Sequence, residues 1–178
     1  MMNKKYLLAG LFTASLGTTS IAAAGAGDAY AGVSVGNASP DSSNFDSTIG
    51  WKIFGGYELN DILAVEGGYV SFGEMDGPTE IGATTVFEAT GFEAAVVGNY
   101  PLNSQFSVFG KVGLLAWDAE LSNPNSVFSF SDTGTDVFFG IGAQYEISGN
   151  FAVRGSWESY TVEDGDIDFL SASAVFGF

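Results

Sequence analysis

Apolar residues alternate with small or polar residues along most of the chain, in eight segments. A period of two is the pattern of β-strands, because successive side chains point to opposite faces of a sheet. The segments cover residues 28–36, 47–57, 62–73, 84–100, 105–117, 135–147, 151–162 and 167–178. Their connections are alternately long and short, the short ones lying at 58–61, 101–104 and 148–150. The pattern therefore predicts an all-β fold with eight antiparallel strands that wind up and down.

A four-residue motif that begins with tyrosine occurs three times, at a spacing of about 45 residues. The three copies are Tyr57-Glu58-Leu59-Asn60, Tyr100-Pro101-Leu102-Asn103 and Tyr145-Glu146-Ile147-Ser148. Each copy ends one alternating segment, and the next segment starts within a few residues. This order predicts one β-hairpin repeated around a closed sheet.

In each segment the side chains at every second position point to the same face of the sheet, and such a set of positions is here called a parity. One parity of each segment is apolar, as in Ile49, Trp51 and Ile53. The other parity carries small and polar residues: Ser34, Lys52, Gly56, Glu66, Gly68, Glu93, Lys111, Gly113, Gly142, Gln144, Arg154, Ser156, Glu158, Ser171 and Ser173. Parity alone is compatible with two arrangements. A soluble sandwich or lipocalin-like barrel would bury the apolar set, whereas a barrel in a membrane would turn it toward lipid.

Three observations favour the membrane arrangement. The polar parity is rich in Gly, Ala and Ser, which fit the narrow interior of an eight-stranded barrel. The cations Lys52, Lys111 and Arg154 all lie on that parity in mid-segment, where burial favours pairing with the acids beside them. Aromatic residues gather next to the short turns, as in the interfacial girdle of outer-membrane barrels. We therefore predict an eight-stranded antiparallel up-and-down transmembrane β-barrel.

The first 24 residues have the features of a secretory signal peptide. Lys4 and Lys5 precede an apolar core at residues 6–16, and Ala22-Ala23-Ala24 before Gly25 satisfies the cleavage rule for small residues. A second possible site, before Gly32, would cut into the first predicted strand. We expect a signal peptide at 1–24 and an outer-membrane barrel domain at 25–178, which places the protein in the bacterial outer membrane.

Charge and composition exclude several classes of function. The full chain holds 21 acids, five cations and no cysteine or histidine; without residues 1–24 three cations remain, a formal net charge of −18. Nucleic-acid binding is excluded because phosphate contacts need a basic face. Hydrolases and acyltransferases of this compartment use a histidine base, so we expect no enzyme and no cofactor. The run Asp164 to Asp168 resembles a calcium loop, but Phe169 stands where that loop needs glycine, so we expect no metal.

The chain resembles the transmembrane barrel of the OmpA family of outer-membrane proteins over residues 27–178. The matching stretches are 56–60 running into 66–69, then 99–102, 111–117, 132–134, 140–145 and 176–178. The resemblance implies an interior arginine on the seventh strand paired with a glutamate on the third, and Arg154 and Glu66 match these positions. The internal repeat also gives both the same distance from a turn, so equal depth in the barrel follows independently of the family.

The chain departs from the family pattern at other interior positions. A further lysine and acid of the family match Val97 and Gln144 here, and its first-strand lysine matches Ser34. The resemblance therefore gives little support for an arginine that switches between two acids. The closing aromatics Phe176 and Phe178 are similar to the signal read by the outer-membrane assembly machinery, although an ordinary lipid contact would explain Phe178 as well.

Two functions remain. In the first, the lumen network Glu66, Lys111, Arg154, Glu158, Lys52 and Glu93 fills the barrel, which has a structural or surface-interaction role. In the second, the same residues line a narrow porin-like channel for ions or small solutes. We expect a monomer in contact with lipid and lipopolysaccharide, with a possible host or phage ligand at the long loops, where Phe128 and Phe130 are candidates. The acidic loops reflect either divalent-cation bridging to lipopolysaccharide or salt adaptation.

Overall fold

The computed structural model describes residues 28–41, 46–80, 83–122, 130–162 and 165–178. The predicted signal peptide and Phe128 lie outside these residues. The strands are β1 (Ala29–Pro40), β2 (Thr48–Asn60), β3 (Leu63–Glu80), β4 (Ala83–Pro101), β5 (Phe106–Ser122), β6 (Phe130–Ser148), β7 (Phe151–Val162) and β8 (Gly165–Gly177). Within the described ranges no helix is long and apolar enough to cross a membrane.

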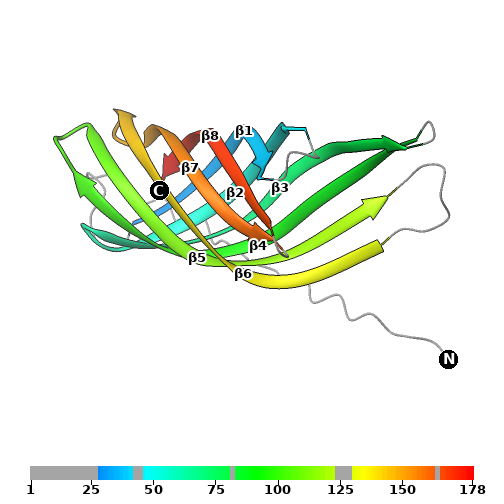
Figure 1. Cartoon of the computed structure of the whole chain (residues 1–178). Helices are drawn as coiled ribbons and strands as arrows, with labels where there is room; N and C mark the ends of the chain where they lie inside the picture. Colours follow the sequence, from blue (N-terminus) through cyan, green and yellow to red (C-terminus); the bar gives the residue numbers. More distant parts are fainter. Residues whose placement is uncertain (1–27, 42–45, 81–82, 123–129, 163–164) are drawn as a thin grey trace.

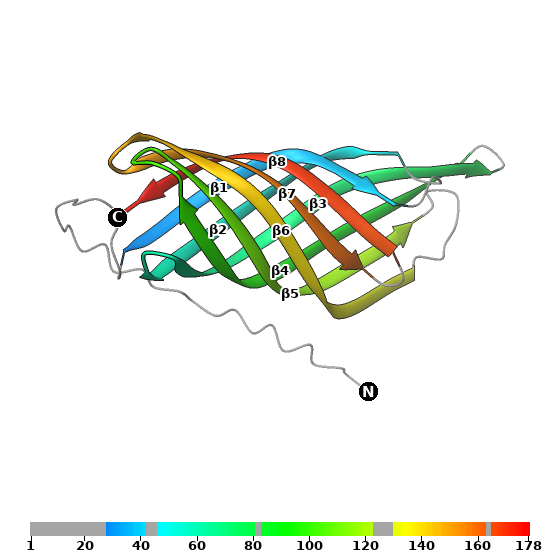
Figure 2. The same cartoon turned by 60° about the vertical axis from the view of Figure 1, so that its left-hand side comes forward.

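The eight strands form one closed antiparallel barrel. Each strand pairs with the next along the chain, and β8 pairs with β1 (Figures 1 and 2). The three short turns and the end of β8 lie at one end of the barrel, here termed the turn end, and the opposite end is the loop end. The predicted eight-stranded antiparallel up-and-down fold is confirmed.

The repeated four-residue motif forms the start of each short turn. The side chain of Asn60 accepts hydrogen bonds from the backbone N–H groups of Ile62 and Leu63, at 3.0 and 2.9 Å. Asn103 accepts the equivalent pair from Gln105 and Phe106, both at 2.9 Å. An asparagine that bonds to the backbone two and three residues later closes a tight turn without glycine. The sequence repeat is thus a repeated turn.

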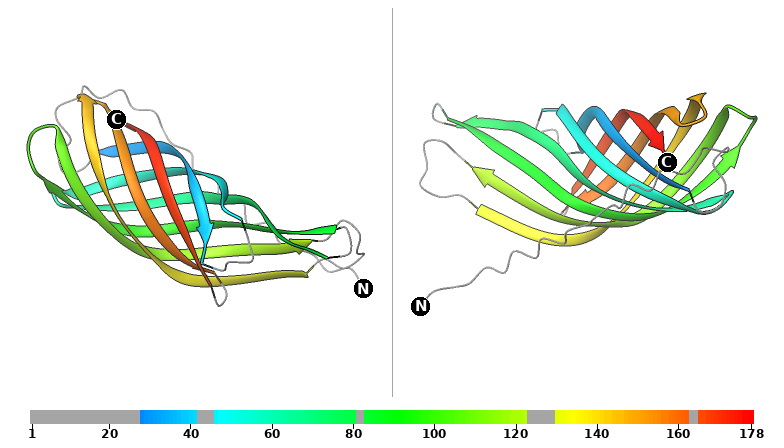
Figure 3. Two further views of the ribbon diagram at one scale, coloured as in Figure 1. Left: turned by 45° about the horizontal axis from the view of Figure 1, so that its top comes forward. Right: turned by 180° about the vertical axis from the view of Figure 1, so that it is seen from behind.

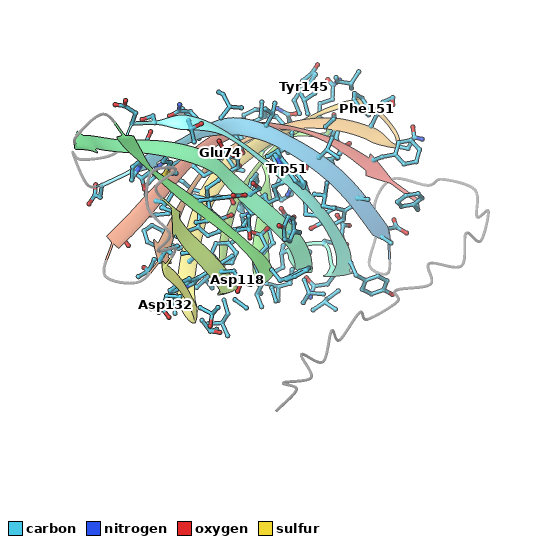
Figure 4. All side chains as sticks on the ribbon, turned by 90° about the vertical axis from the view of Figure 1, so that its right-hand side faces the viewer. Trp51, Glu74, Asp118, Asp132, Tyr145 and Phe151 are labelled. Atoms are coloured by element: carbon cyan, nitrogen blue, oxygen red, sulfur yellow. The ribbon has the colours of Figure 1, made fainter. Side chains whose placement is uncertain are left out.

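The outer surface carries the apolar parity, as the membrane arrangement requires. Large apolar side chains such as Ile49, Phe92 and Leu170 are each more than 60% exposed, which only a lipid environment makes favourable. Tyr145 and Phe151 point away from the barrel near the turn end (Figure 4). The aromatic side chains exposed at this end are Tyr57, Tyr100, Tyr145, Phe151, Phe176 and Phe178.

The strands β3 to β6 are longer than predicted. They hold 17 to 19 residues each, whereas β1, β2, β7 and β8 hold 12 or 13. The loops predicted at 74–83 and 118–134 are therefore too long: β3 continues to Glu80 and β6 begins at Phe130. Beyond the lipid layer the outward face of a strand meets water, so its outward residues need not be apolar and the sequence pattern that marks a membrane strand is lost.

The extra length forms a four-stranded sheet at the loop end, here termed the wall. It comprises residues 74–80, 83–90, 116–122 and 130–135 of β3 to β6. Both long hairpins run past the ends of the other four strands (Figure 3). About 9–11 tilted residues cross the hydrocarbon layer, so strands of this length extend beyond it.

A β-bulge at Gly73 sets the orientation of the wall in β3. Gly73 has a φ of +80°, and the register with β4 shifts by one residue between Ser71 and Glu74. Before the bulge the even-numbered side chains, such as Val70, are buried; after it Met75 is buried and Glu74 is exposed. The bulge therefore exchanges the inner and outer parities between the membrane section and the wall.

Candidate functional site

Six charged side chains converge in the middle of the lumen. Lys52 comes from β2, Glu66 from β3, Glu93 from β4, Lys111 from β5, and Arg154 and Glu158 from β7. Each stands on the inward parity of its strand and is at most 6% exposed. These are the six residues that sequence analysis assigned to the lumen, and the structure brings all of them together.

The six charges form one chain of alternating sign. Arg154 Nη1 lies 2.5 Å from Glu66 Oε1. Lys111 Nζ lies 3.5 Å from Glu66 Oε2 and 2.7 Å from Glu158 Oε1. Lys52 Nζ contacts Glu158 Oε2 and lies 3.4 Å from Glu93 Oε1. The order is therefore Arg154, Glu66, Lys111, Glu158, Lys52, Glu93. With three cations and three carboxylates, the fully ionised network is electrically neutral.

Neutral side chains add hydrogen bonds to the network, although Glu66 Oε2 accepts none and has only its ion pair with Lys111. The Tyr30 hydroxyl donates to Glu66 Oε1 at 2.8 Å, and Ser156 Oγ donates to Glu158 Oε1 at 3.0 Å. Gln144 Oε1 accepts from Arg154 Nε and Nη2, at 3.2 and 3.0 Å. The Tyr160 hydroxyl lies between Glu158 Oε2, which it contacts, and Glu93 Oε2, at 2.7 Å. Buried charges are tolerated when such partners replace their water.

Sequence analysis missed Tyr30 and Tyr160. Both share the inward parity of the charged residues: Tyr30 pairs with Gly56, and Tyr160 stands two residues after Glu158. Strict use of parity would have found them.

An apolar cluster fills the lumen at the turn end, and is here termed the lower plug. Its members are Tyr30, Phe54, Ala64, Val97, Phe109, Ala152 and Val175. The Arg154 guanidinium carbon lies 4.6 Å from the centre of the Phe109 ring and 5.3 Å from that of Phe54. Arg154 thus joins the network to the plug through ion pairing on one side and cation–π contacts on the other.

A second apolar cluster, the upper plug, fills the lumen toward the loop end. Phe138 stacks on Tyr160 with ring centres 4.7 Å apart, and Phe72 meets the same tyrosine edge-on at 5.0 Å. The other members are Ala38, Val70, Met75, Ala89, Ala95, Leu115, Trp117, Ala119, Val162, Ile167 and Phe169. The predicted polar lumen therefore holds only for its middle, because both ends are apolar.

The order of residues within single strands places the network between the plugs. Along β5, counted from the turn end, Phe109 is followed on the inward parity by Lys111 and then by Leu115. Along β7, Ala152 is followed by Arg154 and Glu158, and then by Tyr160. Sequence analysis treated the apolar residues as one outward set, so inward aromatics such as Phe109 were not recognised as lumen residues.

Glycines make room for the large inward side chains. A Cβ added at Gly142 would lie 2.4 Å from Phe109 Cζ and 2.4 Å from the backbone oxygen of Gly155. At Gly32 an added Cβ would lie 2.3 Å from Phe54 Cζ. The narrow lumen therefore accepts a ring only where the neighbouring strand has no side chain.

The remaining predicted residues lie at the two ends of the barrel. Phe176 and Phe178 are both exposed, with ring centres 5.3 Å apart, and Phe178 N donates to Ala29 O at 2.8 Å. Their role as an assembly signal stays a prediction. Asp164 lies outside the described residues, and Asp166 Oδ1 accepts a hydrogen bond from the Thr161 hydroxyl at 3.0 Å.

Known proteins resemble this chain in sequence. It is 30% identical over 122 residues to outer membrane protein A of Yersinia pseudotuberculosis, covering 66% of this chain and 34% of that protein. It is 28% identical over 131 residues to outer membrane protein A of Escherichia fergusonii, covering 70% of this chain and 36% of that protein. The chain thus spans about a third of the length of these relatives.

Solved structures share the fold. OprG from Pseudomonas aeruginosa matches with a TM-score of 0.67 and 11% identity, covering 89% of this chain and 99% of that one. Neisserial surface protein A matches with a TM-score of 0.65 and 17% identity, covering 84% and 97%. The model of the outer membrane protein beta-barrel domain matches residues 7–178. The chain belongs to this family of outer-membrane β-barrels, and its location is the bacterial outer membrane.

Proposed function

We propose that this protein is a structural or surface-interaction barrel of the outer membrane whose lumen is closed to solutes. The observation that carries the proposal is the neutral six-charge network held between two apolar plugs. Moving an ion into a dry interior costs several kcal/mol, which mutual pairing offsets, so a paired network resists both disruption and passage. Apolar constrictions add a second barrier, since water and ions leave them readily.

Conductance of the refolded protein in planar lipid bilayers tests this proposal. We expect no sustained openings, while a large porin inserted under the same conditions serves as the positive control. Circular dichroism of the same preparation in vesicles checks that the barrel is folded. Sustained openings would contradict the proposal and favour the alternative, a narrow porin-like channel.

We propose that the protein is not an enzyme. We also propose that it contacts the lipids of the outer membrane through the sides of the barrel and binds any other partner at the loop end. The exposed charged side chains of the described residues are all carboxylates, because Lys52, Lys111 and Arg154 are buried. Ail of Yersinia pestis, a barrel of the same fold, has been solved with the heparin analogue sucrose octasulfate. An acidic loop end repels such a polyanion, so we expect no retention on heparin at physiological salt.

We also propose that residues 1–24 are removed during export and that the closing aromatics guide assembly. The intact mass of protein extracted from outer membranes should then correspond to a chain that starts at Gly25. A chain that starts at Met1 or at Gly32 would contradict this cleavage site. Replacing Phe178 with alanine should slow insertion into vesicles that contain the purified assembly machinery, whereas insertion into vesicles without it should change little.

A further inference from the structure

An exposed aliphatic side chain stands between each girdle tyrosine and the short turn that follows it. Two positions after the tyrosine of the repeated motif the residue is Leu59, Leu102 or Ile147. These side chains are 51%, 54% and 55% exposed. Aliphatic groups of this size are unfavourable in water. The tyrosines are therefore not the last apolar residues of the outer surface on the side of the turns.

The protein itself gives these aliphatic side chains little cover. The register of β2 with β3 shifts between Glu58 and Asn60, so Leu59 stands at a β-bulge without a cross-strand partner. The register of β6 with β7 shifts in the same way at Ile147. Leu102 stands one residue past the end of β4. Any cover for these three positions must therefore come from outside the described chain.

The outward residues of β2, β4 and β6 form apolar runs of equal length. At the loop end, the outward residue just before each run is Ser47, Thr90 or Thr135. From there every outward residue is apolar or small as far as the aliphatic residue before the turn. The three runs cover residues 49–59, 92–102 and 137–147. A run that ended at the tyrosine would be two residues shorter.

Only the longer run matches the thickness of the membrane. Strands of outer-membrane barrels rise about 3.4 Å per residue and tilt by about 35–45°, so they advance about 2.4–2.8 Å per residue along the membrane normal. A run that ends at the tyrosine would span roughly 19–22 Å, whereas the full run spans roughly 24–28 Å. The apolar band of such barrels is about 25 Å tall. The aliphatic residues are therefore needed to complete it.

The aliphatic residues surround the barrel instead of marking one side of it. They belong to β2, β4 and β6, and Phe178 at the end of β8 is 51% exposed. Figure 2 shows these strand ends together at the turn end of the closed barrel. A partner protein or a second copy of this chain would cover one side, whereas lipid covers every side. The positions are also continuous with the outer surface that already faces lipid.

The turns are too short to extend far beyond this level. Three residues separate each aliphatic residue from the first outward residue of the next strand, which is again apolar: Leu63, Phe106 and Phe151. One of the residues between, Ile62, is itself apolar and 55% exposed. The head-group layer of a bilayer is about 5–8 Å thick on each side. Three-residue turns fit within a layer of that thickness.

We propose that the turn end is inserted into the adjacent phospholipid leaflet, with Leu59, Leu102 and Ile147 in the hydrocarbon and the turns among the head groups. The tyrosine rings then lie just inside the hydrocarbon boundary. The Tyr145 hydroxyl suits this depth, because a protein group, Gln105 Nε2, donates to it at 3.4 Å. The inference goes beyond the proposed function and does not depend on whether the lumen conducts.

Spin labels test the depth of the three aliphatic positions. The chain contains no cysteine, so a single introduced cysteine carries the only label. Leu59→Cys, Leu102→Cys and Ile147→Cys are labelled one at a time, and each protein is refolded in phosphatidylcholine vesicles. Power saturation compares collisions of the label with oxygen, which enriches in lipid, and with a nickel chelate, which stays in water.

The matched control is Ser104→Cys, which places the label in the middle of a turn. The ratio of oxygen to nickel collisions should be at least about threefold higher at each aliphatic position than at this control. Val112→Cys in the apolar belt and Thr133→Cys in the wall provide the lipid and water references.

A second measurement changes the length of the apolar run. The triple variant Leu59→Asn, Leu102→Asn and Ile147→Asn ends each run at its tyrosine. Stability to denaturant is measured in vesicles of increasing acyl length. The bilayer thickness of greatest stability should fall by about 5 Å relative to the unchanged protein.

The matched control for this measurement makes the same kind of change at the other end of each run. It is the triple variant Ser47→Asn, Thr90→Asn and Thr135→Asn. These positions lie just outside the apolar runs, so the optimal thickness should stay unchanged.

Three results would overturn the proposal. The first is a collision ratio at all three aliphatic positions equal to that at Ser104→Cys, which would mean that they face water and are free for a protein partner. The second is shielding of only one or two positions together with a dimer by light scattering, since a second copy would then cover one side. The third is an unchanged optimal thickness in the first triple variant.

Discussion

Arg154 is the residue on which the lumen depends most. It connects three kinds of contact: an ion pair with Glu66, hydrogen bonds to Gln144, and the ring faces of Phe54 and Phe109. Each contact replaces part of the hydration that a guanidinium loses in a dry interior. Because these partners come from β2, β3, β5 and β6, Arg154 connects several strands across the lumen.

Replacing Arg154 with alanine should lower the free energy of unfolding by about 3–5 kcal/mol, since Glu66 is left as an unpaired buried charge. The double variant Arg154→Ala with Glu66→Gln should recover part of this loss, because the orphaned charge is then neutral. Guanidinium titration in lipid vesicles, followed by tryptophan fluorescence, measures both. A single variant that loses less than about 1 kcal/mol would contradict the pairing.

Gly142 should tolerate no side chain. Its substitution by alanine places a Cβ against Phe109 and the backbone of Gly155, and should cost about 1–3 kcal/mol in the same titration. Gly155→Ala is the matched control, because an added Cβ there has no atom within 4 Å. Equal stability of the two variants would show that the lower plug is loosely packed.

At the scale of the strands, the part of the barrel that lies in the membrane is recognised by the apolar side chains that point outward from it. Val112 lies in the middle of β5 and is 56% exposed, between Val96 of β4 and Phe139 of β6 in the register. Thr135 of β6 has the same outward orientation but stands in the wall. Substitutions at these two positions therefore compare a side chain that faces lipid with one that faces water, on the same outer surface of neighbouring strands.

Val112→Arg should cost about 2–4 kcal/mol, the range for a cation at the bilayer midplane, whereas Thr135→Arg should cost less than about 1 kcal/mol. Unfolding in vesicles of fixed acyl length measures both variants. Equal costs would mean that the apolar belt is wrongly placed on β5 and β6.

The membrane section could be predicted from the sequence because lipid imposes a strict rule on it. Every outward residue between the aromatic girdle and the wall must be apolar or small, so the eight segments, the turns and the six lumen charges followed from parity. The outward residues of the wall face water and need not be apolar. The end of β3 and the start of β6 were therefore predicted wrongly. The bulge at Gly73 also escaped prediction, because one glycine among many carries no mark of a positive φ.

The plugs escaped prediction for a different reason. An aromatic residue on the outer face and one in the lumen are equally apolar, so Phe54 and Phe92 look alike to a hydrophobicity scale. The structure separates them: Phe54 is 6% exposed and Phe92 is 69% exposed. One signal is parity, since Phe54 stands two residues after the inward Lys52; a second is its register with glycines, Gly32 on one side and Gly68 on the other.

At the scale of the whole molecule, the closure proposed for the lumen would rest on three barriers in series: the lower plug, the ionic network and the upper plug. Removing the lower plug by Phe54→Ala with Phe109→Ala should therefore leave the barrel silent in planar bilayers, because the network and the upper plug remain. Adding Leu115→Ala and Phe138→Ala should raise the frequency of openings. Openings in the first variant alone would show that the lower plug is the principal barrier.

The confinement of Lys52, Lys111 and Arg154 to the lumen has a practical consequence. Trypsin cleaves after lysine and arginine, and residues 25–178 contain these three cleavage positions and no others. All three are inaccessible in the folded state. The native protein should thus survive digestion whole, while an unfolded molecule is cut into a few large fragments, so a single proteolysis gel reports the folded fraction directly.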